Sequence, residues 1–154
     1  MIVWSNSAFQ RDFALKAVQA ALFHTNCPMP LITLTLQSPK TVAFKTGVLD
    51  AVQDALVHVG VPPTDRFHRV LELSPEDFRF DRTYPDVIGQ RSDDFVLIEV
   101  LWSVGRSVKV KKQFLAHLIE RLSAQGHQPE DVMVVFKETN WENWSFAGGR
   151  QIHV

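Results

Sequence analysis

The side chains best suited to metal or nucleophilic chemistry are widely spaced in this sequence. Its histidines are His24, His58, His68, His117, His127 and His153, and its one cysteine is Cys27. No two histidines are four residues apart, the spacing that puts two zinc ligands on one helix face. No G-x-S-x-G segment supports a Ser-His-Asp triad, and no glycine-rich phosphate loop is present. We therefore expect no metal site, and histidines that are solvated or partly buried.

The composition is that of one ordinary globular domain, with 45% hydrophobic and 21% charged residues. A formal net charge of −1 provides no long-range field, so neither a nucleic acid nor a membrane surface is an expected partner. No apolar run approaches the roughly 18–20 residues of a membrane helix. One cysteine cannot form an internal disulfide, and charged residues interrupt the N-terminal apolar stretch where a secretory signal would lie. The cytoplasm is therefore the expected compartment.

A shift of 66 residues brings two parts of the chain into register without a gap. The matched segments are Leu31–Leu36 with Leu97–Trp102, Lys40–Val42 with Arg106–Val108, and Pro63–Asp65 with Pro129–Asp131. The matched positions share character more than identity, as an old duplication would leave them. The alternative is a chance alignment of two ordinary α/β units.

Each of the two parts has the pattern of a β-α-β unit. Alternating or continuous apolar residues predict strands over residues 31–36, 67–73, 95–101 and 132–136. Apolar residues three and four positions apart predict helices around residues 48–56 and 114–122. Gly60 and Gly126 stand where a helix C-cap would lie.

The predicted fold class is α/β, of the α+β kind. Two tandem β-α-β units, at about 30–73 and 95–137, form one four-stranded sheet with both helices on one face. The other face stays apolar, so we expect an oligomer to cover it. Residues 74–94 read as a connecting loop with a short strand around 78–80. The tail 140–149 has three aromatic residues and either packs on the core or walls a ligand.

The order and spacing of several motifs resemble the tautomerase superfamily, whose type member is 4-oxalocrotonate tautomerase. The motifs are Met29–Leu34, Gly60–Phe67, Arg91–Ile98, Gly105–Ser107 and Glu142–Gly149. They cover nearly all of residues 29–150, and the similarity is greatest to the long-chain branch that includes malonate semialdehyde decarboxylase. Membership would imply a tautomerase-like domain over residues 29–154 that assembles as a homotrimer and uses no cofactor.

The resemblance assigns a chemical role to three residues. Pro30 would be the N-terminal acid–base group after removal of Met29. A free proline is a secondary amine whose ordinary pKa, ~7.7–8.0 for an α-amino group, lets it be neutral and basic near pH 7. Asp65 would assist water or the substrate, or else only cap a turn. Arg106 would bind the substrate carboxylate and hold the charge of an enolate.

Other matched positions would bind the substrate, and one departs from the pattern. Trp144 and Phe146 match aromatic residues that wall the site. Lys40 matches an early basic position and would bind substrate or be a solvated residue at a helix start. Arg91 would bind an anion or pair with Asp93 or Asp94. Val104 stands where the decarboxylase branch has a second arginine, which argues against decarboxylation.

The implied function is keto–enol proton transfer on a small carboxylate-bearing 2-oxo or enol acid. One alternative is a hydratase or decarboxylase-like lyase of the same superfamily. Another is a non-catalytic oligomeric binding protein, if residues 1–28 are retained.

Residues 1–28 decide whether this chemistry is possible. Within a longer chain the nitrogen of Pro30 is a tertiary amide with no useful basicity. We expect Met29 to be the working start and residues 1–28 to be a non-native or mis-annotated extension. The alternative is a real segment in which Phe13–His24 forms a helix that occludes or replaces the site.

Overall fold

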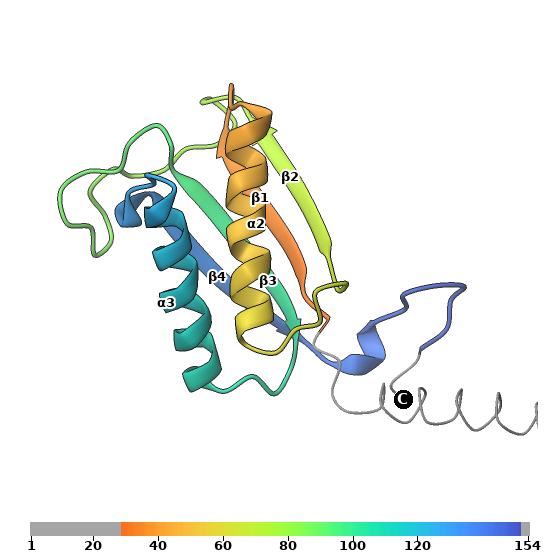
Figure 1. Cartoon of the computed structure of the whole chain (residues 1–154). Coiled ribbons are helices and arrows are strands. Elements are labelled where there is room, and N and C mark those ends of the chain that lie inside the picture. Colours follow the sequence, from red (N-terminus) through yellow and green to blue (C-terminus); the bar gives the residue numbers. More distant parts are fainter. Residues whose placement is uncertain (1–28, 152–154) are drawn as a thin grey trace, which may run out of the picture.

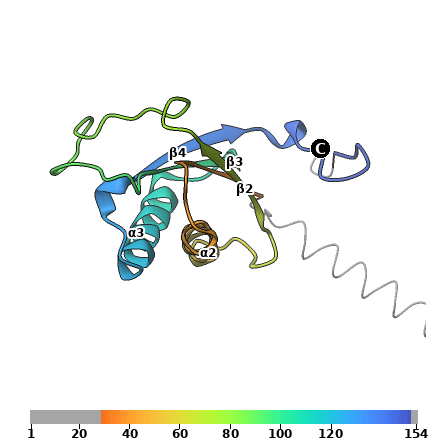
Figure 2. The same cartoon turned by 90° about the horizontal axis from the view of Figure 1, so that it is seen from above.

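Two helices pack on one face of a four-stranded sheet (Figures 1 and 2). The computed structural model describes residues 29–151. The expected extension over 1–28, with its predicted helix over 13–24, lies outside the described residues. Neither of the two helices described in residues 29–151 has the length and apolar character needed to cross a membrane.

The four strands and two helices predicted for the two β-α-β units are present. The strands are β1 (Leu31–Gln37), β2 (Phe67–Leu73), β3 (Val96–Ser103) and β4 (Val132–Thr139), and the helices are α2 (Val42–His58) and α3 (Val108–Ala124). Short 3-10 helices cover Pro129–Asp131 before β4 and Trp141–Asn143 after it. The two helices begin and end at positions 66 residues apart, as the internal repeat predicts.

The sheet has the strand order β2-β1-β3-β4. Pairing is parallel within each β-α-β unit and antiparallel between the central strands β1 and β3. Thr33 and Glu99, which are equivalent in the repeat, pair directly with each other. A pseudo-two-fold axis therefore crosses the sheet at this pair, and the predicted fold class is confirmed.

The helix ends follow from local capping. The hydroxyls of Thr41 and Ser107 accept hydrogen bonds from the backbone N–H groups of Phe44 and Val110, at 3.1 and 3.3 Å. These side chains satisfy N–H groups that the first turn leaves without helical partners. Gly60 and Gly126 have φ values of +97° and +89°, the left-handed conformation that ends a helix with little steric cost.

The core lies between the helices and one face of the sheet. Alternate strand residues supply one side of it: Ile32, Leu34, Leu36, Val96, Ile98, Val100 and Trp102. The helices supply the other side with Val48, Val52, Ala55, Leu56, Phe114, Leu118 and Leu122. Burial of each large aliphatic side chain contributes roughly 1.5–3 kcal/mol to folding. The packed layer therefore holds the strands, and with them the loops at the strand ends, in fixed positions.

The helix-free face of the sheet carries exposed apolar side chains. Phe67 and Leu71 of β2 are 51% and 40% exposed, and Met133 of β4 is 40% exposed. In the centre of this face the Arg69 guanidinium donates a hydrogen bond to the Thr33 hydroxyl at 2.8 Å. This face is thus partly apolar and not covered by the helices.

The loop over residues 74–94 contains no strand, so the strand predicted around residues 78–80 is wrong. The rings of Phe78 and Phe80 pack on Phe95, with centroids 6.0 and 4.3 Å away. Packing of the aromatic rings, rather than hydrogen bonding to a neighbouring strand, therefore holds this segment on the sheet.

Arg91 holds the same loop together. Its guanidinium donates hydrogen bonds to the backbone carbonyls of Asp81 and Tyr84, at 2.8 and 2.7 Å. Asp93, one of its two expected partners, is instead paired with Arg82.

Candidate active site

The strand directions bring four chain segments to one end of the sheet. Leu31, at the start of β1, pairs with Phe67 at the start of β2 and with Leu101 near the end of β3. Ser103 and Thr139 end β3 and β4 side by side. The start of β1 and the tail after β4 accordingly lie together in Figure 1. We call this edge the Pro30 end.

A pocket of about 210 Å³ opens at the Pro30 end. It is lined by Met29, Pro30, Leu31, Phe67, Trp144, Ser145 and Phe146, and we call it the Pro30 pocket. The rings of Trp144 and Phe146 are stacked, with centroids 5.3 Å apart and planes 15° apart. Pro30 itself is buried. The structure thus brings together the proline and the two aromatic residues that the sequence singled out.

Asp65 lies two residues before β2, at the same end of the sheet. Its side chain is buried, with 7% of the residue exposed. Among the described residues neither of its carboxylate oxygens has a hydrogen-bond partner. Burial raises the pKa of Asp65 from 3.8 to about 6, because the charged form loses its hydration. Such a carboxyl group can hold or release a proton near neutral pH.

Gln53 of α2 fixes the loop that carries Asp65. Its side-chain amide donates to the backbone carbonyls of Pro63 and Asp65, both at 3.4 Å. Gln53 is only 2% exposed, so a polar group on the buried helix face orients the loop. The sequence analysis did not identify Gln53. The signal available in the sequence was a polar residue within the apolar face of the predicted helix.

Arg106 lies in the loop between β3 and α3. Its guanidinium carbon is 5.4 Å from the ring centre of Trp102, and Trp102 packs on Phe114 and Phe136. The arginine therefore lies against a buried, tightly packed aromatic side chain. Among the described residues, neither Asp65 nor Arg106 lines the Pro30 pocket itself; both lie in loops at its end of the sheet.

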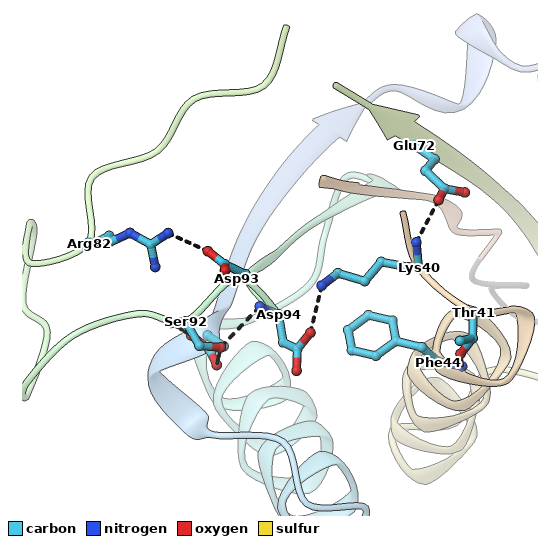
Figure 3. Close-up of polar contacts among 9 residues, drawn as sticks. Lys40, Thr41, Phe44, Glu72, Arg82, Ser92, Asp93 and Asp94 are labelled. Atoms are coloured by element: carbon cyan, nitrogen blue, oxygen red, sulfur yellow. Dashed lines mark hydrogen bonds and ion pairs between the residues drawn. The ribbon is translucent and has the colours of Figure 1, made fainter. Parts of the chain in front are cut away.

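Lys40 follows the C-terminal end of β1, at the end of the sheet opposite Pro30. Its ammonium group pairs with Asp94 at 2.7 Å, and its backbone N–H donates to the Glu72 carboxylate at 2.8 Å (Figure 3). The seven residues of β1, at ~3.3 Å each, span roughly 23 Å. Within one chain Lys40 therefore cannot touch a ligand in the Pro30 pocket, and the structure does not bring it to the other candidate residues.

Leu31 and Phe67 are pocket residues to which sequence reasoning gave no role. They face the helix-free side of the sheet, so the Pro30 pocket opens on that side. The signal for Phe67 was an aromatic residue at the first position of an edge strand, within a motif already noted. Within residues 29–151, no group of three or more His, Cys, Asp or Glu side chains is arranged to hold a metal ion.

Comparison with known sequences gives two matches. A family model described as "Tautomerase enzyme" matches residues 65–147. The probable tautomerase YusQ of Bacillus subtilis (strain 168) is 23% identical over 124 residues, which cover 79% of this chain and 96% of the relative.

Comparison with solved structures identifies similar folds. A malonate semialdehyde decarboxylase, described with decarboxylase and hydratase activities, is 32% identical with a TM-score of 0.71, covering 79% of this chain and 93% of that one. A malonate semialdehyde decarboxylase inhibited by 3-bromopropiolate is 31% identical, with the same TM-score and coverage of 79% and 92%. A fused 4-OT, solved as a symmetric trimer, shares the fold at 24% identity and a TM-score of 0.60, covering 79% and 94%.

Proposed function

Because this chain belongs to the tautomerase family, we propose that it catalyses cofactor-independent proton transfer between keto and enol forms of a small carboxylate-bearing acid. The observation that carries the proposal is Pro30, buried at the start of β1 in a pocket with Trp144 and Phe146. A proton-transfer group beside apolar walls is the arrangement that binding and acid–base chemistry on a small organic acid require.

Pro30 is the proposed acid–base group, and its ring nitrogen must be free. The neutral secondary amine takes a proton from the carbon next to the carbonyl, which leaves an enolate and an ammonium group. The ammonium delivers a proton to the enolate oxygen, directly or through a neighbouring acid, which completes the enol and restores the neutral amine; ketonisation is the same transfer in reverse. Burial lowers the pKa of such an amine, because it disfavours the ammonium form.

Asp65 and Arg106 are the proposed partners of Pro30. Arg106 would pair with the substrate carboxylate and stabilise the negative charge that develops on the enolate oxygen. Asp65, with its raised pKa, would supply or accept a proton at that oxygen, or orient a water molecule.

The first test compares two forms of the protein on phenylenolpyruvate. We expect protein that begins at Pro30 to accelerate ketonisation, and the 154-residue chain to be inactive because its Pro30 nitrogen is acylated. Mass spectrometry of the N-terminus of the native active protein provides an independent check. Equal activity of both forms would contradict the role of Pro30.

The second test removes individual side chains from the form that begins at Pro30. We expect Pro30→Ala and Arg106→Ala to lower kcat/KM by roughly 10²-fold or more, as typical for loss of a proton-transfer or anion-binding group. Arg121→Ala is the matched control, since Arg121 pairs with Asp54 at 2.9 Å on the helix side, away from the pocket. Unchanged rates in both site variants would exclude the proposed roles.

A lyase or hydratase is the second candidate function. It is favoured by the 32% identity to malonate semialdehyde decarboxylase and by the buried carboxyl group of Asp65, which could activate water. Val104 at the position of that branch's second arginine argues against decarboxylation. Assays of water addition to an unsaturated acid and of CO₂ release distinguish these activities from tautomerisation. If neither form of the protein turns over any of these substrates yet binds a small acid, a non-catalytic binding protein remains.

A further inference from the structure

A second pocket, of about 260 Å³, opens at the end of the sheet away from Pro30. It is lined by Phe78, Arg79, Phe80, Asp81, Tyr84, Pro85, Arg91, Phe95, Leu97 and Met133, and we call it the loop pocket. Leu97 pairs with Thr35 in the register that faces the helix-free side, so both pockets open on one face.

The loop pocket is the counterpart of the Pro30 pocket in the internal repeat. Six of the residues that line the Pro30 pocket have partners 66 positions away in the loop pocket: Met29 with Phe95, Leu31 with Leu97, Phe67 with Met133, Trp144 with Phe78, Ser145 with Arg79, and Phe146 with Phe80. In each pocket two strands form the floor, and an aromatic pair from the segment after the edge strand forms the wall. The pseudo-two-fold axis at Thr33 and Glu99 explains this arrangement.

We propose that the loop pocket is a second, non-catalytic binding site for a small carboxylate with a flat apolar body. The rings of Phe78, Phe80 and Phe95 lie with centroids 4.3–6.1 Å apart and form the apolar wall. Such a wall suits an aryl or unsaturated chain, since flat groups stack on aromatic side chains.

Two arginines give this pocket its preference for an anion. Arg91 is 8% exposed, two backbone carbonyls fix its guanidinium, and its Nε has no hydrogen-bond partner among the described residues. Arg79 is exposed at the rim. The only carboxylate in the lining belongs to Asp81, which already accepts hydrogen bonds from Thr83 and from the backbone N–H of Tyr84. These hydrogen bonds favour the charged form of Asp81, but with Arg79 and Arg91 the lining carries two positive charges against one negative, so its net formal charge is positive.

The catalytic residues are not repeated in this half, so the site binds without reacting. Val96 stands at the position equivalent to Pro30 and offers only an amide nitrogen. Asp131, equivalent to Asp65, accepts hydrogen bonds from the backbone N–H and the hydroxyl of Ser92, at 2.6 and 2.5 Å. Lys40, equivalent to Arg106, is held by Asp94 and Glu72 (Figure 3).

Calorimetric titration of the 154-residue chain with 3-phenylpropanoate, which cannot tautomerise, tests this inference. We expect two equivalents to bind per chain. Met133→Trp places a larger side chain in the loop pocket, so this variant should bind one equivalent, in the Pro30 pocket. The matched variant Phe67→Trp places a larger side chain in the Pro30 pocket, so it should bind one equivalent, in the loop pocket. The double variant should bind none. Circular dichroism and melting temperature check that each variant is folded.

Each other outcome decides the question. A single equivalent that Phe67→Trp abolishes and Met133→Trp does not would overturn the inference, and so would no binding at millimolar concentration. A single equivalent that only Met133→Trp abolishes would support the loop pocket and show that the 154-residue chain does not bind the acid beside Pro30. Failure of the inference and failure of the proposed function are thus distinguishable.

A surface variant provides a second test if Met133→Trp does not fold. Arg79→Glu reverses an exposed charge and should weaken one binding event about tenfold, as expected for loss of a charge-assisted contact. Lys112→Glu, an exposed change on α3, is the matched control and should leave both affinities unchanged. Equal affinities in Arg79→Glu and Lys112→Glu would overturn the inference.

Discussion

At the scale of single residues, the charged form of Asp65 is destabilised, because no described residue compensates for the hydration that its carboxylate loses on burial. Its carboxyl group is buried and, within the described chain, receives no hydrogen bond. The equivalent residue in the repeat, Asp131, is just as buried but is held by Ser92. A buried acid that lacks partners lowers stability when it ionises, and such groups concentrate at functional sites.

The pH dependence of stability follows from this group. The unfolded chain releases the Asp65 proton near 3.8 and the folded chain near 6, so between these values the folded state binds more protons. The contribution of Asp65 to the free energy of unfolding should therefore fall as pH rises from 4 to 6, by at most about 3 kcal/mol at ~1.4 kcal/mol per pKa unit. The Asp65→Asn protein should lack this contribution to the pH dependence of its free energy of unfolding.

Urea unfolding at several pH values measures the effect. Asp86→Asn is the control, because Asp86 is exposed and should keep the wild-type slope. An Asp65→Asn protein whose stability changes between pH 4 and 6 by the same amount as that of the wild type would contradict the assignment.

At the scale of elements, the loop before each helix carries a basic residue that is directly followed by the N-cap residue of the helix. Ser107 caps α3 and follows Arg106 at the Pro30 end, while Thr41 caps α2 and follows Lys40 at the opposite end. The two loops are equivalent in the repeat, but only one belongs to the candidate active site. They therefore offer a matched pair for separating stability from function.

We expect Ser107→Ala and Thr41→Ala to lower the free energy of unfolding by similar amounts, about 1 kcal/mol each, through loss of an N-cap. Ser107→Ala should also lower kcat/KM several-fold, because the loop that positions Arg106 loses its anchor. Chemical denaturation and steady-state kinetics of the form that begins at Pro30 measure both effects. Equal kinetic effects of the two substitutions would argue against Arg106 as a substrate contact.

At the scale of the whole molecule, the part of the helix-free face between the two pockets is the surface that an assembly would cover. Leu71 is 40% exposed there and lines neither pocket, whereas Phe67 and Met133 belong to the pocket floors. Burying exposed apolar area of this kind contributes roughly 25 cal/mol per Å², which offsets part of the cost of association. We predict that the chain self-associates over this face, and the resemblance to the tautomerase superfamily implies a homotrimer.

Leu71→Glu should disrupt this assembly. Leu71 lies on β2 and lines neither pocket, so a charge there would be buried without a partner in the interface. Size-exclusion chromatography with light scattering should show a trimer for the wild type and a monomer for the variant. Val57→Glu, on the helix side and 38% exposed, should remain a trimer. A monomeric wild type would refute the proposal.

Periodicity, caps and the repeat were readable from the sequence because they depend on neighbours along the chain. Alternation predicted the strands, three- and four-residue spacing predicted the helices, and Gly60 and Gly126 marked the helix ends. The 66-residue shift predicted two equivalent units, and the motif order predicted the family. None of this requires knowledge of how the two units meet.

The antiparallel pairing of β1 with β3 was decided only in three dimensions. It sends equivalent residues to opposite ends of the sheet, so Arg106 lies at the Pro30 end and Lys40 about a strand length away. Burial is likewise a tertiary property, which is why Asp65 and Asp131 look alike in sequence but only one lacks partners among the described residues. Sequence spacing fixes which residues are equivalent, whereas the direction of strand pairing fixes which residues share a site.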